Sequence, residues 1–199
     1  MIIWVNGAFG SGKSQTSYEI HRRLPNSYVY DPENAGYYIR KNLPSDSKHG
    51  DFQDYPMWRE FNYSMLRYIN ETSSSIIIVP MTITSLQYFD EIVGRLRRDD
   101  IIVHHFTLGA SREVLLHRLK KRGDRADSWP AQQINRCIEG LSHEVFQHHL
   151  NTDRTGIEDV VEQIGSLSGV HLLPDHRSKP RKTVDRLITQ LKQMRLFDH

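Results

Sequence analysis

The chain has 199 residues, of which 38% are hydrophobic and 25% are charged, and its formal net charge is only +2. This is the composition of an ordinary globular protein without a basic excess for nucleic acid, so we expect one cytosolic domain over residues 1–199. The single cysteine excludes an intramolecular disulfide, and no stretch approaches the ~20 apolar residues of a membrane span.

The first predicted element is a buried strand over residues 2–5, which are all apolar. It leads into a stretch that fits the phosphate-binding pattern G-x-x-x-x-G-K-[ST] without a mismatch, and residues 14–24 then have the apolar spacing of a helix. The pattern comprises Gly7, Ala8, Phe9, Gly10, Ser11, Gly12, Lys13 and Ser14.

This strand, loop and helix together predict binding of a nucleoside triphosphate. The glycines let successive backbone N–H groups point at phosphate oxygens, and the positive end of the helix adds to the attraction. Lys13 would contact the β- and γ-phosphates, and the Ser14 hydroxyl would ligate Mg²⁺. We therefore expect ATP and Mg²⁺ as cofactors, against the alternative of a glycine turn that binds nothing.

A second strand is predicted over residues 27–30, and Asp31 follows it directly. Parallel strands bring their carboxyl ends to one edge of a sheet, so Asp31 should lie at the same edge as the phosphate loop. Its carboxylate could accept the proton of an attacking hydroxyl or hold a metal-bound water. The alternative is that Asp31-Pro32 only begins a turn.

The middle of the chain contains a polar stretch, a helix and a strand. Residues 41–56 are rich in turn formers, and a helix over residues 57–70 follows. The apolar face of this helix comprises Trp58, Phe61, Met65 and Ile69. The strand over residues 76–79 is β-branched or apolar throughout, which indicates cover on both faces.

No carboxylate follows this strand, although many P-loop proteins place a Mg²⁺-binding Asp there. Pro80, Met81 and Thr82 occupy the position instead. Mg²⁺ would then depend on Asp31 through a water, or on Ser14 and the nucleotide. Thr82 lies at the correct edge to touch an acceptor molecule, or it caps the next helix.

A helix over residues 86–96 and a strand over 101–108 precede a helix that Ser111 can cap and that ends near Arg122. Its end is basic, and a glycine follows it. Arg118, Arg122 and Arg125 could close over a triphosphate as part of a small helical lid at residues 118–129. A basic run on a helix is also typical of an ordinary solvated face.

The C-terminal third predicts a helix over residues 128–148, a short strand over 149–152, and a helix that begins at a capping box of Thr155 and Glu158. Residues 179–197 then form a basic amphipathic helix. Its apolar positions are Val184, Leu187, Ile188, Leu191 and Met194. This helix either docks on the body of the protein or lies on the inner face of an anionic membrane.

The alternation of strands and helices predicts an α/β P-loop NTPase fold, with a parallel five-stranded sheet flanked by helices on both faces. Several segments also resemble the ATP-binding tunicamycin resistance proteins, a family of small P-loop kinase-like proteins. They are residues 1–13, 28–32 (YVYDP), 51–56 (DFQDYP), 79–83 (VPMTI), 103–108 (VHHFTL) and 137–142 (CIEGLS). The resemblance covers most of the chain to about Asp153.

This resemblance implies a cytosolic or membrane-associated ATP-binding protein that protects bacteria from tunicamycin, a lipidated antibiotic with a uridine and amino sugars. Small drug-modifying kinases such as chloramphenicol phosphotransferase have a similar layout and place a carboxylate where Asp31 stands. By analogy, this implies phosphorylation of the drug.

Residues 51–63 would suit such a small-molecule acceptor. Phe52, Tyr55, Trp58 and Tyr63 offer flat apolar surface, and Asp51, Asp54 and Arg59 offer partners for hydroxyl groups. The alternative is that the aromatic side chains, Trp58 and Phe61 above all, belong to the core.

Three functions remain open from the sequence. The first is an ATP-dependent phosphotransferase that modifies tunicamycin, with Lys13, Asp31, Arg118, Arg122 and Arg125 as its catalytic residues. The second is a protein that binds tunicamycin in an ATP-dependent manner and transfers nothing. The third is a small nucleotide or sugar kinase.

Overall fold

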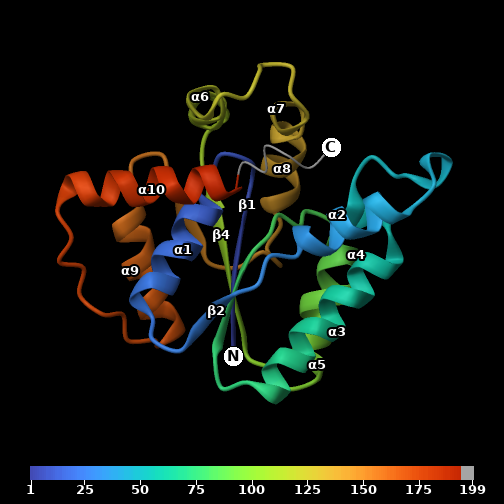
Figure 1. Cartoon of the computed structure of the whole chain (residues 1–199), viewed down its shortest axis with the longest axis horizontal. Coiled ribbons are helices and arrows are strands. Elements are labelled where there is room, and N and C mark those ends of the chain that lie inside the picture. Colours follow the sequence, from blue (N-terminus) through green and yellow to red (C-terminus); the bar gives the residue numbers. More distant parts are fainter. Residues whose placement is uncertain (194–199) are drawn as a thin grey trace.

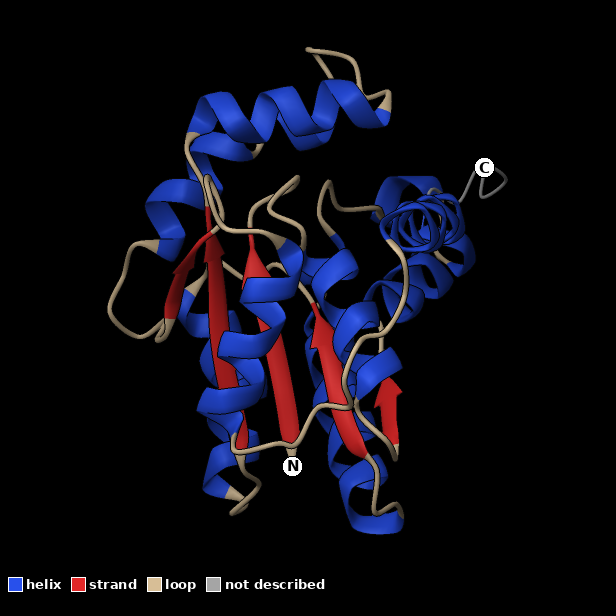
Figure 2. Cartoon of the chain, turned by 90° about the vertical axis from the view of Figure 1, so that its left-hand side faces the viewer, coloured by secondary structure: helices blue, strands red, loops and turns tan. Residues whose placement is uncertain are grey.

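The structure is a computed structural model that describes residues 1–193. The described residues form one sheet in the order β2-β3-β1-β4-β5, and all neighbouring strands are parallel. The strands are β1 (Ile2–Gly7), β2 (Ser27–Val29), β3 (Ile76–Pro80), β4 (Val103–Gly109) and β5 (His149–Asn151). Their arrows point to one edge of the sheet in Figure 2, so the predicted α/β P-loop fold with five parallel strands is confirmed.

The central strand β1 is covered on both of its faces. Its Ile2 pairs with Ile77 of β3 and with Val103 of β4 in one register. Because successive side chains of a strand alternate between faces, Ile2 and Trp4 join one core cluster, whereas Ile3 and Val5 join the other. This double cover explains why residues 2–5 contain no polar side chain.

The helices divide between the two faces of the sheet (Figure 1). On one face, α1 (Lys13–Arg23) packs beside α9 (Ile157–Ser168), and α10 (Lys179–Gln193) lies across α1. The opposite face is covered by α2 (Glu33–Asn42), α3 (Pro56–Thr72), α4 (Leu86–Phe89), α5 (Arg95–Arg98) and α8 (Ile134–Leu141). Two more helices, α6 (Arg112–Arg122) and α7 (Trp129–Gln132), follow β4, and α6 lies above the carboxyl edge (Figure 2).

Shorter helical turns connect these elements. Two 3-10 turns, η1 (Ser45–Ser47) and η2 (Phe52–Asp54), occupy the polar stretch before α3. The π-helical segment η3 (Asp90–Gly94) joins α4 to α5, so the helix expected over residues 86–96 has an irregular middle. Helix α2 was not predicted, because no element was assigned to residues 33–40 from the sequence.

Three other expectations were wrong. Helix α8 ends at Leu141 and not near His148, because Phe146 folds into the core and His148 adopts a left-handed backbone with a φ of 52°. The capping box does not form, because Gly156 is the residue that precedes α9 and no side chain of the described residues caps it. Similarly, Ser111 precedes α6, but its hydroxyl bonds to Asp153 instead of to the helix.

Phe61 was expected on the buried face of α3, but 48% of its surface is exposed. The buried face instead follows Trp58, Asn62 and Leu66, which are spaced four residues apart. Among residues 1–193, no helix is both long and apolar enough to cross a bilayer. The predicted apolar position Met194 of the C-terminal helix lies outside the described residues.

Candidate functional site

The phosphate loop connects β1 to α1 at the carboxyl edge of the sheet. The backbone at Gly7 has a φ of 147°, and a Cβ atom there would lie 2.5 Å from Ser11 Oγ and 2.7 Å from the Leu108 carbonyl oxygen. Gly12 precedes α1 with a left-handed φ of 100°. Glycine is therefore needed at Gly7 for close approach and at Gly12 for backbone conformation.

Lys13 begins α1 and folds back over the loop. Its Nζ atom donates to the carbonyl oxygens of Gly7, at 3.0 Å, and Ala8, at 3.1 Å. Burial lowers the pKa of Lys13 to about 8, although the nearby Cys137 and Glu33 act in the opposite direction. The ammonium thus lies at the loop in a setting that favours an added anionic partner.

Two further observations fit a phosphate at this position. The Ser11 hydroxyl is buried and, in the described part of the chain, has no hydrogen-bond partner. The N-terminus of α1, an eleven-residue helix, opens at the same loop. Ser14 is the second residue of α1, where its hydroxyl could ligate Mg²⁺. Residues 1–193 contain no cluster of three or more His, Cys, Asp or Glu side chains suited to a metal ion.

Asn6 holds the start of the loop and was not identified from the sequence. Its Oδ1 atom accepts from the N–H groups of Gly7, at 2.8 Å, and Ile83, at 3.1 Å. Its Nδ2 atom donates to the Ile83 carbonyl at 2.9 Å and lies 3.2 Å from His105 Nε2. The buried amide therefore joins the phosphate loop to the segment that follows β3, and only its position at the end of a buried strand could have indicated this role.

Thr82 belongs to the same connection. Its hydroxyl donates to the Gly7 carbonyl at 2.7 Å, and the residue is 5% exposed. The prediction that Thr82 touches an acceptor molecule is corrected, because its hydroxyl faces the phosphate loop. Thr82 also does not cap α4, which Ser85 caps by accepting from the Tyr88 N–H.

Asp31 lies at the end of β2 and begins α2. Its Oδ1 atom accepts from the Glu33 N–H at 3.0 Å, and its carbonyl accepts from the Asn34 N–H. This is the turn-forming role that was the alternative for Asp31. Glu33, which was not identified from the sequence, raises the pKa of Lys13, so acidic charge does lie beside the phosphate loop.

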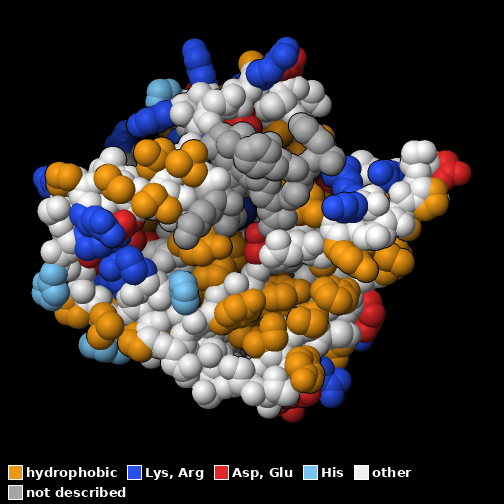
Figure 3. Space-filling view, in the orientation of Figure 1, with side chains coloured by type: hydrophobic (Ala, Val, Ile, Leu, Met, Phe, Trp, Pro, Cys, Tyr) orange, Lys and Arg blue, Asp and Glu red, His pale blue; other side chains and the backbone are white. Residues whose placement is uncertain are grey.

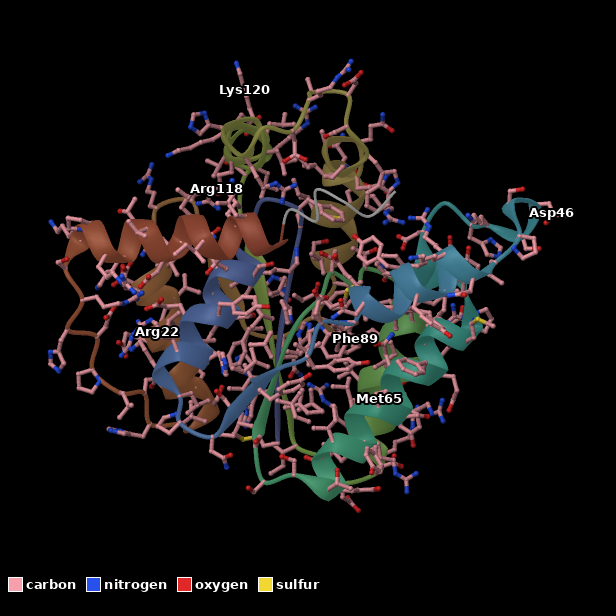
Figure 4. The ribbon with its side chains drawn as sticks, viewed as in Figure 1. Arg22, Asp46, Met65, Phe89, Arg118 and Lys120 are labelled. Atoms are coloured by element: carbon pink, nitrogen blue, oxygen red, sulfur yellow. The ribbon has the colours of Figure 1, made fainter. Side chains whose placement is uncertain are left out.

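The three arginines of the predicted lid lie in different surroundings. Arg118 of α6 bonds to the hydroxyl and carbonyl of Thr152 and, at 3.5 Å, to the Gly10 carbonyl, so it reaches the phosphate loop (Figure 4). Arg122 pairs with Asp124, and its charge lowers the pKa of Lys13. Arg125 pairs with Asp127, and its side chain is 83% exposed, so it does not contact the phosphate loop in this conformation.

Most of the residues predicted to contact an acceptor have structural contacts instead. Trp58 is fully buried and donates through Nε1 to the Pro32 carbonyl at 3.0 Å. The buried Tyr55 accepts the His49 N–H on its hydroxyl, and Arg59 bonds to the Gln53 carbonyl and pairs with Glu91.

The prediction of a ligand surface at Tyr55, Trp58 and Arg59 is therefore wrong, because these side chains are buried and make structural contacts around α3. The half-buried Phe52 packs on Gly36 and Trp58. Asp51 accepts from Gln53 N–H and pairs with Arg136 of α8 at 3.2 Å. Asp46 lies at the tip of the arm formed by residues 43–50, away from the sheet (Figure 4).

Comparison with known proteins places this geometry in a family. A family model described as an AAA domain matches residues 2–142. The structure of the tunicamycin resistance protein of Deinococcus radiodurans is 33% identical, covers 87% of this chain and 99% of its own, and superposes with a TM-score of 0.73. The chain belongs to the P-loop family of tunicamycin resistance proteins.

Other solved structures share the fold but have a lower sequence identity to this chain. A sugar kinase from Janibacter is 17% identical over 85% of this chain and 94% of its own, with a TM-score of 0.58. A gluconokinase from Sinorhizobium meliloti is 20% identical over 81% of this chain and 87% of its own, also with a TM-score of 0.58. These likenesses show a shared fold alone. No curated protein is detectably similar to the sequence.

Proposed function

We propose that the protein transfers the γ-phosphoryl group of ATP to tunicamycin, or to a closely similar nucleoside or sugar compound, and so confers resistance. The observation that carries this proposal is the position of Lys13, whose ammonium lies on the Gly7 and Ala8 carbonyls and is influenced by the charge of Glu33 in α2. Membership of the tunicamycin resistance family supports the choice of acceptor.

The phosphate loop supplies the nucleotide site. Backbone N–H groups of the loop that follows Gly7 bind the phosphates, and Lys13 neutralises charge on the β- and γ-phosphates. Ser14 would ligate Mg²⁺, and the bound ion would neutralise phosphate charge and orient the transferred group. Arg118 contacts the Gly10 carbonyl of the loop, so its guanidinium supplies positive charge beside the phosphate site.

In the transfer step, an acceptor hydroxyl oxygen bonds to the γ-phosphorus while the bond from that phosphorus to the β–γ bridging oxygen breaks, and ADP leaves. The hydroxyl proton passes to a carboxylate at the end of β2, for which we propose Asp31. Arg122 and Arg125 add positive charge when residues 118–129 close over the nucleotide. Closure would have to separate Arg125 from Asp127.

Mass spectrometry of tunicamycin after incubation with the protein and Mg·ATP tests the transfer. We expect a mass gain of one phosphate group, at a rate at least tenfold lower for Asp31→Asn, which cannot take a proton. An unmodified drug that nevertheless binds in an ATP-dependent manner would contradict transfer and favour sequestration.

The hydrogen bond from Glu33 N–H to Asp31 is the observation that favours that rival function, since it assigns Asp31 to a turn. Under sequestration, resistance of cells should follow drug affinity and survive in Asp31→Asn. Under transfer, resistance should fall in Asp31→Asn even though ATP and drug still bind.

The C-terminal helix adds a proposed membrane contact, because its polar face is turned inward. Arg186 pairs with Glu158, and Lys182 pairs with Asp175 at 3.0 Å. Arg177, just before α10, pairs with Glu19 and Asp185. The outer face then carries Val184, Leu187, Ile188 and Leu191, all exposed. Apolar side chains accordingly gather over α10 in the space-filling view (Figure 3).

An apolar stripe flanked by the exposed Lys179 and Arg181 suits an anionic lipid surface. We expect the double variant Leu187→Ser/Leu191→Ser to bind anionic vesicles about tenfold more weakly, given the apolar area lost. Leu167→Ser, on the exposed surface of α9, is the control. Equal cosedimentation of all three proteins would remove α10 from membrane contact.

A further inference from the structure

An open cavity of about 580 Å³ lies between η2, α4 and α8. Its lining includes Asp54, Thr84, Ser85, Tyr88, Arg136 and Glu139. A volume of this size can hold a nucleoside or a disaccharide. None of these residues takes part in the phosphate contacts described above.

The cavity adjoins the phosphate loop through two connections. Thr84 follows the segment in which Thr82 bonds to the Gly7 carbonyl and Ile83 bonds to Asn6. On the other side, Arg136 precedes Cys137, which the Phe9 N–H of the phosphate loop contacts. Gly140 of α8 packs closely on Thr84, where an added Cβ would lie 2.8 Å from Thr84 Cβ. The cavity is therefore beside the loop and at the same edge of the sheet.

Most of the residues that line the cavity carry a polar group, and their charges are in negative excess. Arg136 is balanced by its ion pair with Asp51, whose side chain is 10% exposed. Asp54 accepts a hydrogen bond from the neutral hydroxyl of Tyr88 at 3.0 Å, and Glu139 is exposed on the cavity wall. Two carboxylates thus face the cavity without a cation paired to either among the described residues.

Carboxylates of this kind accept hydrogen bonds from hydroxyl and N–H groups and repel phosphate. Arg59, the other nearby cation, stacks on the Tyr88 ring at 4.2 Å but pairs with Glu91, so it does not offset the excess. A cavity that received a nucleotide or a sugar phosphate would need the opposite charge.

We propose that this cavity holds the phosphoryl acceptor, and that Asp54 and Glu139 select a neutral, hydroxyl-rich group such as a nucleoside against its phosphorylated form. The assignment to an acceptor rests on the proposed function. Under this proposal, specificity for the acceptor depends on side chains of η2 and α8, and not on the buried aromatic residues of α3.

The test compares uridine with uridine monophosphate, two probes that differ only by a phosphate, by calorimetry in the presence of a non-hydrolysable ATP analogue. We expect the full-length protein to bind uridine at least tenfold more tightly than the monophosphate. Asp54→Asn and Glu139→Gln should each reduce this ratio about threefold or more, and their combination should nearly abolish it. Glu144→Gln, in the exposed turn after α8 and outside the cavity, should leave the ratio unchanged.

Hydrogen exchange with tunicamycin as the probe locates the site independently of any charge effect. We expect protection of residues 84–88 and 136–140 on drug binding. Equal affinity for the two uridine probes, a ratio unaffected by both substitutions, or no protection of these segments would each overturn the proposal. None of these measurements requires turnover, so a drug that binds in the cavity without being phosphorylated would contradict the proposed transfer while supporting the cavity.

Discussion

The phosphate loop and the neighbouring cavity are built in different ways. The backbone of Gly7 is held on both sides, by Asn6 at its N–H and by Thr82 and Lys13 at its carbonyl. Asn6 and Thr82 are buried. The cavity wall, in contrast, exposes Asp54, Arg136 and Glu139, and α8 is joined to the start of η2 by the ion pair of the half-exposed Arg136 with Asp51.

This difference separates two tasks. Buried hydrogen bonds are costly to leave unmade, so the loop geometry depends on the fold and resists substitution. Exposed charges contribute little to stability, so the side chains that would choose an acceptor can change without unfolding the protein. The predictions below test this separation, from the largest expected effect to the smallest.

The largest effect is expected for Gly7→Ala. Its Cβ would meet the Leu108 carbonyl at 2.7 Å and force a backbone that L-residues avoid. We expect ATP affinity to fall more than a hundredfold and the free energy of unfolding to fall by about 2–4 kcal/mol. Gly169→Ala is the matched control, because its φ of 67° is also left-handed but its Cβ would meet nothing within 4 Å among the described residues.

Gly169→Ala should therefore cost only backbone strain, about 1–2 kcal/mol, and leave ATP affinity unchanged. Calorimetric titration with ATP and chemical denaturation measure the two quantities. Equal losses in both variants would show that the loop is no more constrained than an ordinary helix end.

Lys13→Ala removes charge-assisted contacts to phosphate that contribute about 1.5–3 kcal/mol, so ATP affinity should fall roughly ten- to a hundredfold. The free energy of unfolding should hardly change, because before ligand binds the lysine ammonium contacts the Gly7 and Ala8 carbonyls and the Phe9 ring, all of the same loop. Lys41→Ala, an exposed lysine of α2, is the control. ATP binding by Lys13→Ala with the affinity of the unmodified protein would contradict a phosphate loop.

The pH dependence of ATP affinity follows from the same lysine. Burial lowers the pKa of Lys13 to about 8, and bound phosphate should raise it again. ATP affinity should then be constant below pH 8 and fall by up to about tenfold per pH unit above it. If the same pH dependence of ATP affinity were found in Lys13→Ala, a group other than Lys13 would cause it.

The free energy of unfolding should change in the opposite direction. The unfolded chain keeps the ordinary lysine pKa of 10.5, so between pH 8 and 10.5 it binds more protons than the folded protein. The contribution of Lys13 to the free energy of unfolding therefore rises with pH across this window. Denaturation curves at pH 7.5 and pH 9.5, compared with those of Lys13→Ala, measure this contribution of Lys13.

The smallest effect is expected for Arg136→Ala on the cavity side. Its ion pair with Asp51 leaves the arginine side chain 50% exposed, so the free energy of unfolding should fall by less than about 1 kcal/mol. Chemical denaturation measures this change. A loss comparable to that of Gly7→Ala would remove the contrast between the two regions.

Sequence patterns predicted the fold and the phosphate loop because each depends on local signals. The apolar runs of β1 and β3 determine the central strands, and the glycine spacing determines the loop. The α10 segment shows the limit of such patterns. Its spacing predicts an amphipathic helix, but the inward orientation of its polar face depends on Glu158 of α9, which pairs with Arg186 and is distant in the chain.

The residues that would contact an acceptor were harder to predict, because their surroundings also depend on parts of the chain that are distant in sequence. Trp58 and Tyr55 could be ligand contacts or core, and only the packing of α3 on the sheet decides for core. The cavity combines η2, α4 and α8, with side chains more than eighty positions apart, such as Asp54 and Glu139. Nothing in the local sequence of either indicates the other.

The fate of the ATP γ-phosphate tests the central claim most directly. The protein would be incubated with tunicamycin, Mg²⁺ and ATP labelled at the γ-phosphate, and the label would be followed by chromatography. We expect the label in tunicamycin, with ADP formed in equal amount. Label that stays in ATP, or that appears only as inorganic phosphate while the drug remains bound and unmodified, would contradict phosphoryl transfer.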